Sequence, residues 1–213
     1  MYNLPNLLTL SRIAVIPLIF LSAYSNYCFV NYIAGVLFIA ASITDYYDGK
    51  LARARGEVSA FGRLLDPIAD KLLVATALVV ILVKQVKIGG IETPIISKIS
   101  YIPVFVILCR ELLVSGLREF LREVNVGLPV TRLAKWKTGF QMTALSMLFF
   151  KGWFYWGGIG EVLLWVAGVL TFVTGYQYFA KSLEYIKNEN KQKATSSVPA
   201  KKSPAKGKAK TKK

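Results

Sequence analysis

Residues 44–71 read TDYYDGKLARARGEVSAFGRLLDPIADK, and this stretch constrains the fold more than any other. It holds four aspartates, Asp45, Asp48, Asp66 and Asp70, between two strongly apolar segments. A charged side chain at the centre of a bilayer costs about 2.5–3.5 kcal/mol on insertion scales, and this cost falls at a helix end that faces a wet cavity. The stretch therefore predicts two neighbouring helices whose polar ends meet near a membrane surface.

The composition places the chain among integral membrane proteins. Of its 213 residues, 54% are hydrophobic, and the mean hydropathy is +0.45. That is too apolar for an ordinary soluble domain. The sequence contains no histidine, which removes the usual general base and the commonest ligand of transition metals. Acid–base chemistry must therefore fall to carboxylates, lysine, tyrosine or cysteine.

Six apolar segments are long enough to span a membrane, since a helix needs about 20 residues to cross roughly 30 Å of hydrocarbon. Only helices and closed barrels satisfy the backbone in lipid, and these segments have the length of helices. We therefore expect an all-α integral membrane protein with six transmembrane helices, at residues 7–25, 30–49, 66–87, 99–121, 137–156 and 158–182.

Basic residues gather in alternate connections between these segments. The 50–65 connection and the 122–137 connection each hold four lysine or arginine residues. Because lysine and arginine are enriched in cytoplasmic loops, both connections should face the cytoplasm. With an even number of spans, the N-terminus and the C-terminus should lie on the same side.

The C-terminal segment differs from the rest of the chain. Residues 187–213 contain ten lysines and one acidic residue, in a low-complexity pattern that is typical of disorder. We therefore expect a six-helix membrane domain over residues 1–186 and a disordered polybasic cytoplasmic tail over residues 187–213. Each lysine near an anionic membrane surface contributes about 1 kcal/mol, which favours lipid over nucleic acid as the partner of the tail.

Helical spacing groups the aspartates in pairs. Asp45 and Asp48 are three residues apart, and Asp66 and Asp70 are four apart, so each pair shares one helix face. Four carboxylates without histidine favour Mg²⁺, Mn²⁺ or Ca²⁺ over zinc or copper. Two such ions about 3.5–4 Å apart can clamp a diphosphate and stabilise a displacement at phosphorus. Arg53 adds a planar fork that suits phosphate.

Three other interpretations remain open at this point. The aspartates could pair with nearby arginine and lysine in a surface loop. They could form the acidic site of a divalent-cation transporter or channel, although transport would predict charges through the depth of the bilayer. A lysine-tailed membrane tether would explain the tail but not the aspartates.

The spacing resembles the signature of the CDP-alcohol phosphatidyltransferase family, D-x-x-D-G-x-x-A-R-x8-G-x3-D-x3-D, and all eight fixed residues are present from Asp45 to Asp70. The resemblance implies a six-helix homodimer in a lipid bilayer that transfers a phosphatidyl or similar group from a CDP-linked donor to an alcohol and releases CMP. It implies two divalent ions, Mg²⁺ or Mn²⁺, held by the four aspartates, with Asp70 as general base. It also implies a CDP-binding set, namely Asp45, Gly49, Ala52, Arg53, Gly62 and Asp66.

Other blocks resemble the bacterial phosphatidylglycerophosphate synthases within that family, namely the Asn3–Arg12 block and the Arg110–Gln141 block. This resemblance implies CDP-diacylglycerol as donor, glycerol 3-phosphate as acceptor, and a place in phospholipid biosynthesis at the bacterial inner membrane. A basic cluster would hold the acceptor phosphate, and its candidate members are Arg118, Lys135, Lys137, Arg110 and Lys71.

Two alternatives remain for this cluster and for the acceptor. The lysines could serve only as positive-inside anchors, and Glu111 could be a structural partner of Arg110. A sister enzyme of the family would use phosphatidylglycerol, serine or inositol phosphate as acceptor instead.

Overall fold

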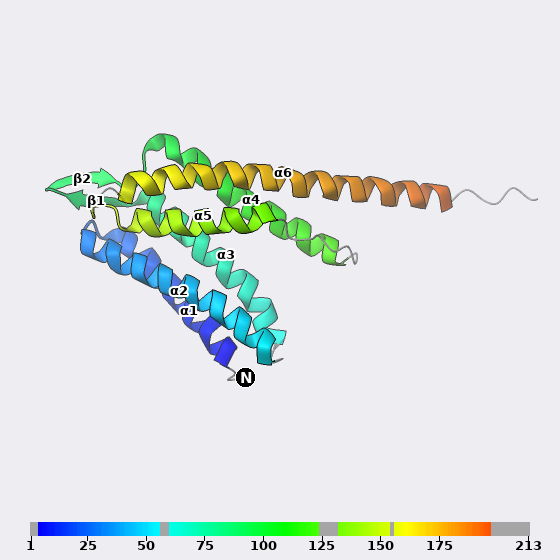
Figure 1. Cartoon of the computed structure of the whole chain (residues 1–213), viewed down its shortest axis with the longest axis horizontal. Coiled ribbons are helices and arrows are strands. Elements are labelled where there is room, and N and C mark those ends of the chain that lie inside the picture. Colours follow the sequence, from blue (N-terminus) through cyan, green and yellow to red (C-terminus); the bar gives the residue numbers. More distant parts are fainter. Residues whose placement is uncertain (1–3, 56–59, 124–131, 154–155, 197–213) are drawn as a thin grey trace, which may run out of the picture.

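A computed structural model describes residues 4–55, 60–123, 132–153 and 156–196. This part of the chain is mainly helical (Figure 1). Two short 3₁₀ turns, Ser22–Tyr24 and Lys98–Ser100, precede α2 and α4. The long helices are α1 (Leu4–Leu21), α2 (Cys28–Arg55), α3 (Ala60–Val83), α4 (Tyr101–Glu123), α5 (Arg132–Phe149) and α6 (Trp156–Ser196).

Among the described residues, four helical segments are long and apolar enough to cross a membrane, namely Leu7–Tyr24, Cys28–Asp45, Lys98–Arg122 and Trp156–Tyr185. The other two expected spans correspond to α3 and α5, which are helical but carry more than two charged residues in every 18-residue stretch. Asp66, Asp70 and Lys71 lie in α3, and Lys135 and Lys137 lie in α5. The polar residues of these two helices therefore account for the difference.

A β-hairpin follows α3, where the sequence analysis expected helix up to residue 87. Strands β1 (Gln85–Ile88) and β2 (Ile91–Pro94) pair antiparallel. Gly89 and Gly90 join them with φ angles of 57° and 87°, as a two-residue hairpin turn with positive φ requires. The all-α expectation is wrong here, because a Gly-Gly pair between β-prone residues favours a hairpin over a helix.

The last helix is longer than expected. The apolar segment was expected to end at residue 182 and disorder to begin at residue 187, but α6 has 41 residues and continues to Ser196. Residues 187–196 are helical instead of disordered, since lysine, glutamate, glutamine and alanine are all good helix formers. Residues 197–213 lie outside the described part of the chain.

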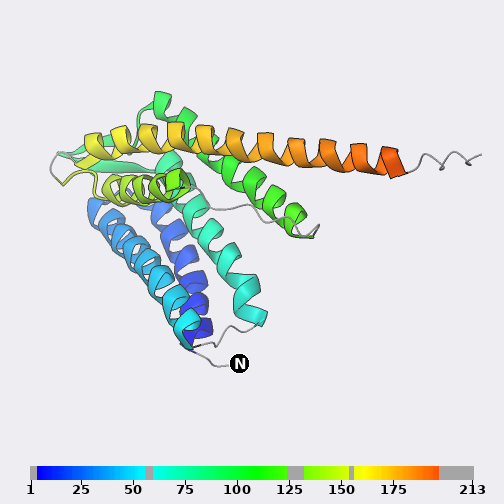
Figure 2. The ribbon, with the colours of Figure 1, turned by 45° about the vertical axis from the view of Figure 1, so that its right-hand side comes forward.

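The helices alternate in direction, so equivalent ends gather together. Figures 1 and 2 show the start of α1, the end of α2 and the start of α3 at the end of the molecule opposite the hairpin. The C-terminal ends of α4 and α6 also point away from the hairpin. The C-terminal ends of α2 and α4, from which the two basic connections continue, thus both lie away from the hairpin.

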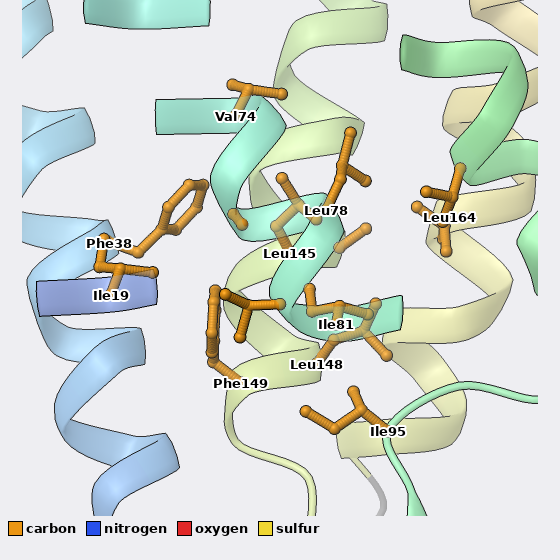
Figure 3. Close-up of a cluster of buried hydrophobic side chains, with 14 of the residues drawn as sticks. Ile19, Phe38, Val74, Leu78, Ile81, Ile95, Leu145, Leu148, Phe149 and Leu164 are labelled. Atoms are coloured by element: carbon orange, nitrogen blue, oxygen red, sulfur yellow. The ribbon is translucent and has the colours of Figure 1, made fainter. Parts of the chain in front are cut away.

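The hydrophobic core lies where α3 passes between the other helices. Helix α3 packs against α1, α4 and α5, and α6 packs against both α4 and α5. Leu78 and Ile81 of α3 are fully buried. The rings of Phe38 in α2 and Phe149 in α5 lie 5.8 Å apart between their centres (Figure 3). This core holds α3 in place and so positions the carboxylates in its first half.

Candidate functional site

Three of the four signature aspartates have described side chains, and α1 contacts two of them. Thr9 Oγ1 donates a hydrogen bond of 2.5 Å to Asp66 Oδ1. Arg12 Nη1 lies 2.7 Å from Asp45 Oδ1. The carboxylate of Asp45 also lies within electrostatic range of the carboxylates of Asp66 and Asp70, which repel it. At the junction of α1, α2 and α3, Asp66 and Asp70 thus lie within electrostatic range of Asp45, but the three described carboxylates are not close enough to one another to form a metal site.

The contribution of α1 is a finding that sequence reasoning missed. Thr9 and Arg12 are 2% and 1% exposed, although both lie in a predicted apolar span. A buried guanidinium is stable only beside an opposite charge, so Arg12 in an apolar segment was the available signal. The alternative that the aspartates pair with arginine is therefore observed for Asp45, but its partner comes from another helix and not from a surface loop.

We expect Arg12→Ala to lower the free energy of unfolding by roughly 2–4 kcal/mol, because it leaves a partly buried carboxylate without its partner. The measurement is thermal unfolding of the purified protein in detergent. Arg122→Ala is the matched control, since its pair with Glu119 is mostly exposed and such pairs contribute about 0–1 kcal/mol. Equal shifts in the two variants would contradict a structural role for the Arg12–Asp45 pair.

A polar cavity of about 380 Å³ opens beside these carboxylates, between α3, α4 and α5. Its size falls in the range of small-molecule sites, roughly 300–1,000 Å³. Five basic and three acidic side chains line it, an excess of two positive charges. The lining residues are Pro67, Asp70, Lys71, Arg110, Glu111, Val114, Ser115, Arg118, Glu119, Arg122, Ala134, Lys137 and Thr138. The cavity therefore suits an anionic ligand.

Glu111 contacts two of the basic side chains that line the cavity. Lys137 Nζ donates a hydrogen bond to Glu111 Oε1, and Arg110 Nη1 lies 3.2 Å from the same oxygen. Glu111 is thus a structural partner of Arg110, as one sequence alternative held, and equally a partner of Lys137. Because Lys137 is 3% exposed, this carboxylate compensates a charge that burial would otherwise penalise.

Two further cations are held by neutral partners. Arg118 Nη2 donates a hydrogen bond of 3.0 Å to the hydroxyl of Tyr178, and its guanidinium carbon lies 5.0 Å from the centre of the tyrosine ring. Lys71 Nζ donates to Ser115 Oγ. Neutral partners orient both side chains, and neither forms an ion pair with the side chains that the structure describes, so their charge can act on a ligand. Tyr178, from α6, carries no sequence signal that links it to this site.

The remaining predicted residues are placed as follows. Gly62 is buried in the first turn of α3. Lys135 is exposed and does not belong to the described lining of the cavity, whereas Lys137, two residues later, is buried there. Asp48 of the predicted metal set, and Gly49, Ala52 and Arg53 of the predicted CDP set, lie on the helical backbone of α2, and their side chains fall outside the described residues.

The described carboxylates fit hard divalent cations in chemistry. Among the described side chains, no three of the His, Cys, Asp or Glu type are close enough to form a metal site. Asp48, the fourth member of the predicted set, has no described side chain. The set offers only carboxylate oxygens, which Mg²⁺ and Mn²⁺ prefer. A divalent cation there would relieve the repulsion between Asp45, Asp66 and Asp70.

Comparison with known proteins shows the family to which the chain is related. A profile of the CDP-alcohol phosphatidyltransferase family matches residues 2–173. A Rickettsia felis protein is 46% identical over 187 residues, which cover 86% of this chain and 97% of that protein. A Cereibacter sphaeroides protein is 37% identical over 227 residues, covering 88% and 99% respectively.

A Pectobacterium atrosepticum protein is 36% identical over 179 residues, covering 83% of this chain and 93% of that protein. All three relatives bear the name CDP-diacylglycerol–glycerol-3-phosphate 3-phosphatidyltransferase. The family match extends from before α1 into α6 and so covers α1 to α5 completely, whereas Tyr178 of α6 lies beyond it. On this evidence the chain belongs to the CDP-alcohol phosphatidyltransferase family.

Proposed function

We propose that this protein transfers the phosphatidyl group of CDP-diacylglycerol to sn-glycerol 3-phosphate, giving phosphatidylglycerophosphate and CMP in phospholipid biosynthesis. The observation that carries the proposal is that Asp70 lines the same cavity as five basic side chains. A carboxylate that can accept a proton therefore lies beside a place for an anionic alcohol. The names of the relatives support the same reaction.

The reaction needs a base and a site for each substrate. The hydroxyl oxygen of glycerol 3-phosphate attacks the phosphorus that bears diacylglycerol, and its proton passes to the Asp70 carboxylate. The bond from that phosphorus to the oxygen of CMP breaks, and CMP leaves. A carboxylate base is the natural choice in a chain that has no histidine. Arg118 and Lys71 hold the acceptor phosphate.

Asp45, Asp48, Asp66 and Asp70 are the residues that would hold two Mg²⁺ or Mn²⁺ ions. Bound there, such ions would neutralise the diphosphate of the donor and the charge of departing CMP. Arg12 and Thr9 hold Asp45 and Asp66 from the side of α1. These contacts keep the two carboxylates in position at the ends of different helices.

The cavity also bears on the choice of acceptor. An excess of two positive charges favours an acceptor with a phosphate over serine, which carries no net charge. Inositol phosphate and phosphatidylglycerol each bear a phosphate, so charge alone separates them less well. The volume of about 380 Å³ favours a compact acceptor over a second lipid.

The membrane arrangement belongs to the same proposal. All six long helices cross the bacterial inner membrane, with α3 and α5 shielded by the other four. The active site, the N-terminus and the C-terminus face the cytoplasm, because the connections after α2 and α4 carry the basic residues. The protein is a homodimer, and its lysine-rich end lies along anionic lipid.

The deciding experiment is CMP release by the purified protein with CDP-diacylglycerol and Mg²⁺ or Mn²⁺. Glycerol 3-phosphate, serine, inositol phosphate and phosphatidylglycerol are offered in separate reactions. Release with glycerol 3-phosphate alone is the expected result. Release with another alcohol would support the reaction type of the family but would reject glycerol 3-phosphate as the acceptor. No release from folded, metal-supplied protein would reject the reaction and favour the cation-transporter alternative.

Removal of divalent cations tests the carboxylate site. We expect excess EDTA to abolish CMP release and added Mg²⁺ or Mn²⁺ to restore it, since carboxylate oxygens bind these ions when deprotonated. Zn²⁺ should restore less, because it prefers nitrogen and sulfur ligands. Undiminished release in EDTA would contradict a metal role for the aspartates.

Truncation tests the lysine-rich end. We expect a chain that ends at Ser196 to keep most of its CMP release in detergent, because α6 remains whole and residues 197–213 contribute nothing to the described cavity. In anionic vesicles the same truncation should weaken membrane binding, by about 1 kcal/mol for each lysine that lay at the surface. Loss of CMP release in detergent would show that residues 197–213 are needed for catalysis.

A further inference from the structure

A second pocket, an apolar groove of about 310 Å³, lies between α4 and α6. Its walls are mostly large apolar side chains, namely Phe105, Cys109, Leu113, Phe172, Tyr176 and Phe179. Phe105, Phe172 and Tyr176 are 69%, 66% and 69% exposed. Since α4 and α6 both contain segments that can cross a membrane, the groove opens towards lipid. We call it the α4–α6 groove.

Two polar atoms belong to residues that line this apolar groove. Thr171 is fully buried, and its Oγ1 has no hydrogen-bond partner in the part of the chain that the structure describes. Arg110 Nε is buried and likewise has no partner there. A buried polar atom without a partner is unfavourable, because it has lost its hydrogen bonds to water. Two such atoms in one groove indicate a ligand that combines an apolar body with oxygen acceptors.

The helices approach closely where Arg110 crosses to α6. A Cβ atom at Gly175 would lie 2.9 Å from Arg110 Cγ, and a Cβ at Gly168 would lie 2.7 Å from Pro103 Cβ. Gly175 therefore lets the stem of Arg110 rest against the backbone of α6, and Gly168 does the same for Pro103. Arg110 also lines the polar cavity beside Asp70, so one side chain forms the partition between the cavity and the groove.

We infer that the α4–α6 groove binds one acyl chain of the phosphatidyl lipid that the reaction forms. An ester oxygen of that lipid accepts hydrogen bonds from Arg110 Nε and the Thr171 hydroxyl, and the chain lies along the aromatic walls. The inference rests on the proposed function, because the product lipid arises in the cavity on the other side of Arg110. A groove of about 310 Å³ with mainly apolar walls suits part of one acyl chain.

Photolabelling tests whether this lipid occupies the α4–α6 groove. The full-length protein in phosphatidylcholine nanodiscs receives a trace of phosphatidylglycerophosphate with a diazirine in one acyl chain, and crosslinks are mapped by mass spectrometry. Phosphatidylcholine with the same chain reports general lipid exposure. Labelling of the groove residues of α4 and α6 several-fold above that control is expected. Equal labelling by both probes, or labelling elsewhere, would overturn the inference.

Matched variants locate the binding. Cys109→Phe places a phenyl ring in the groove from α4. Leu112→Phe is the control, because it places the same ring on α4 at a residue that is 73% exposed and lies outside the described lining of the groove. Thr171→Val removes only the unpartnered hydroxyl and should lower labelling roughly 2- to 10-fold, the effect of one neutral hydrogen bond. We expect Cys109→Phe to lose labelling and Leu112→Phe to keep it. Equal labelling of these two variants would place the lipid elsewhere.

CMP release from the wild-type protein separates the two proposals. Release with glycerol 3-phosphate but no specific label in the groove would reject the lipid site and leave the proposed function standing. Specific labelling of the groove, together with no CMP release for any of the acceptors, would support lipid binding at the groove. It would reject the proposed reaction as the source of that lipid.

Discussion

Replacing Asp70 by asparagine is expected to reduce CMP release by roughly 10²–10⁴-fold, the usual contribution of a positioned general base. The amide side chain keeps the size of the carboxylate but cannot accept the proton of the attacking hydroxyl. The amide also weakens any metal ligation at this position, so the rate of CMP release should fall by more than the lower limit of this range. The measurement is the initial rate of CMP release at saturating CDP-diacylglycerol and glycerol 3-phosphate.

The matched control is Glu119→Gln, which makes the same carboxylate-to-amide change in the same cavity. Glu119 is exposed and pairs with Arg122, so its loss should alter the rate far less. Both variants should elute as folded protein from detergent and unfold near the wild-type temperature. An Asp70→Asn protein that is folded and retains its turnover would remove Asp70 as the base.

The second large effect is expected for Arg118→Ala, which should raise the KM for glycerol 3-phosphate by about 10- to 100-fold, as loss of a hydrogen bond to a charged group implies. Tyr178 holds this guanidinium through a hydrogen bond and through its ring face, and both contacts leave the positive charge for a ligand. The KM for CDP-diacylglycerol should change much less.

Lys135→Ala is the informative comparison for Arg118. The spacing of basic residues assigned both side chains to the acceptor phosphate, whereas Lys135 is exposed and outside the described lining of the cavity. Its removal should leave both KM values close to those of the wild type. Similar increases in the two KM values for Arg118→Ala would place that arginine outside the acceptor site.

Several properties of this protein follow from its sequence alone. The helical segments could be predicted because the length of an apolar run is a local property that the thickness of the bilayer constrains. The pairing of Asp66 with Asp70 on one face of α3 follows from helical periodicity. The Gly89–Gly90 pair carries a local signal for a hairpin turn, since two consecutive positive φ angles favour glycine, but the sequence analysis missed it and expected helix up to residue 87.

Only the tertiary structure decided which side chains meet. Lys135 and Lys137 are equivalent in sequence, but two helical positions differ by roughly 200° around the axis, so packing of α5 against its neighbours buries one and exposes the other. Arg12 pairs with Asp45 and Tyr178 pairs with Arg118 across different helices, over separations of 33 and 60 residues. Such contacts depend on how whole helices pack together, and no local pattern of residues contains that information.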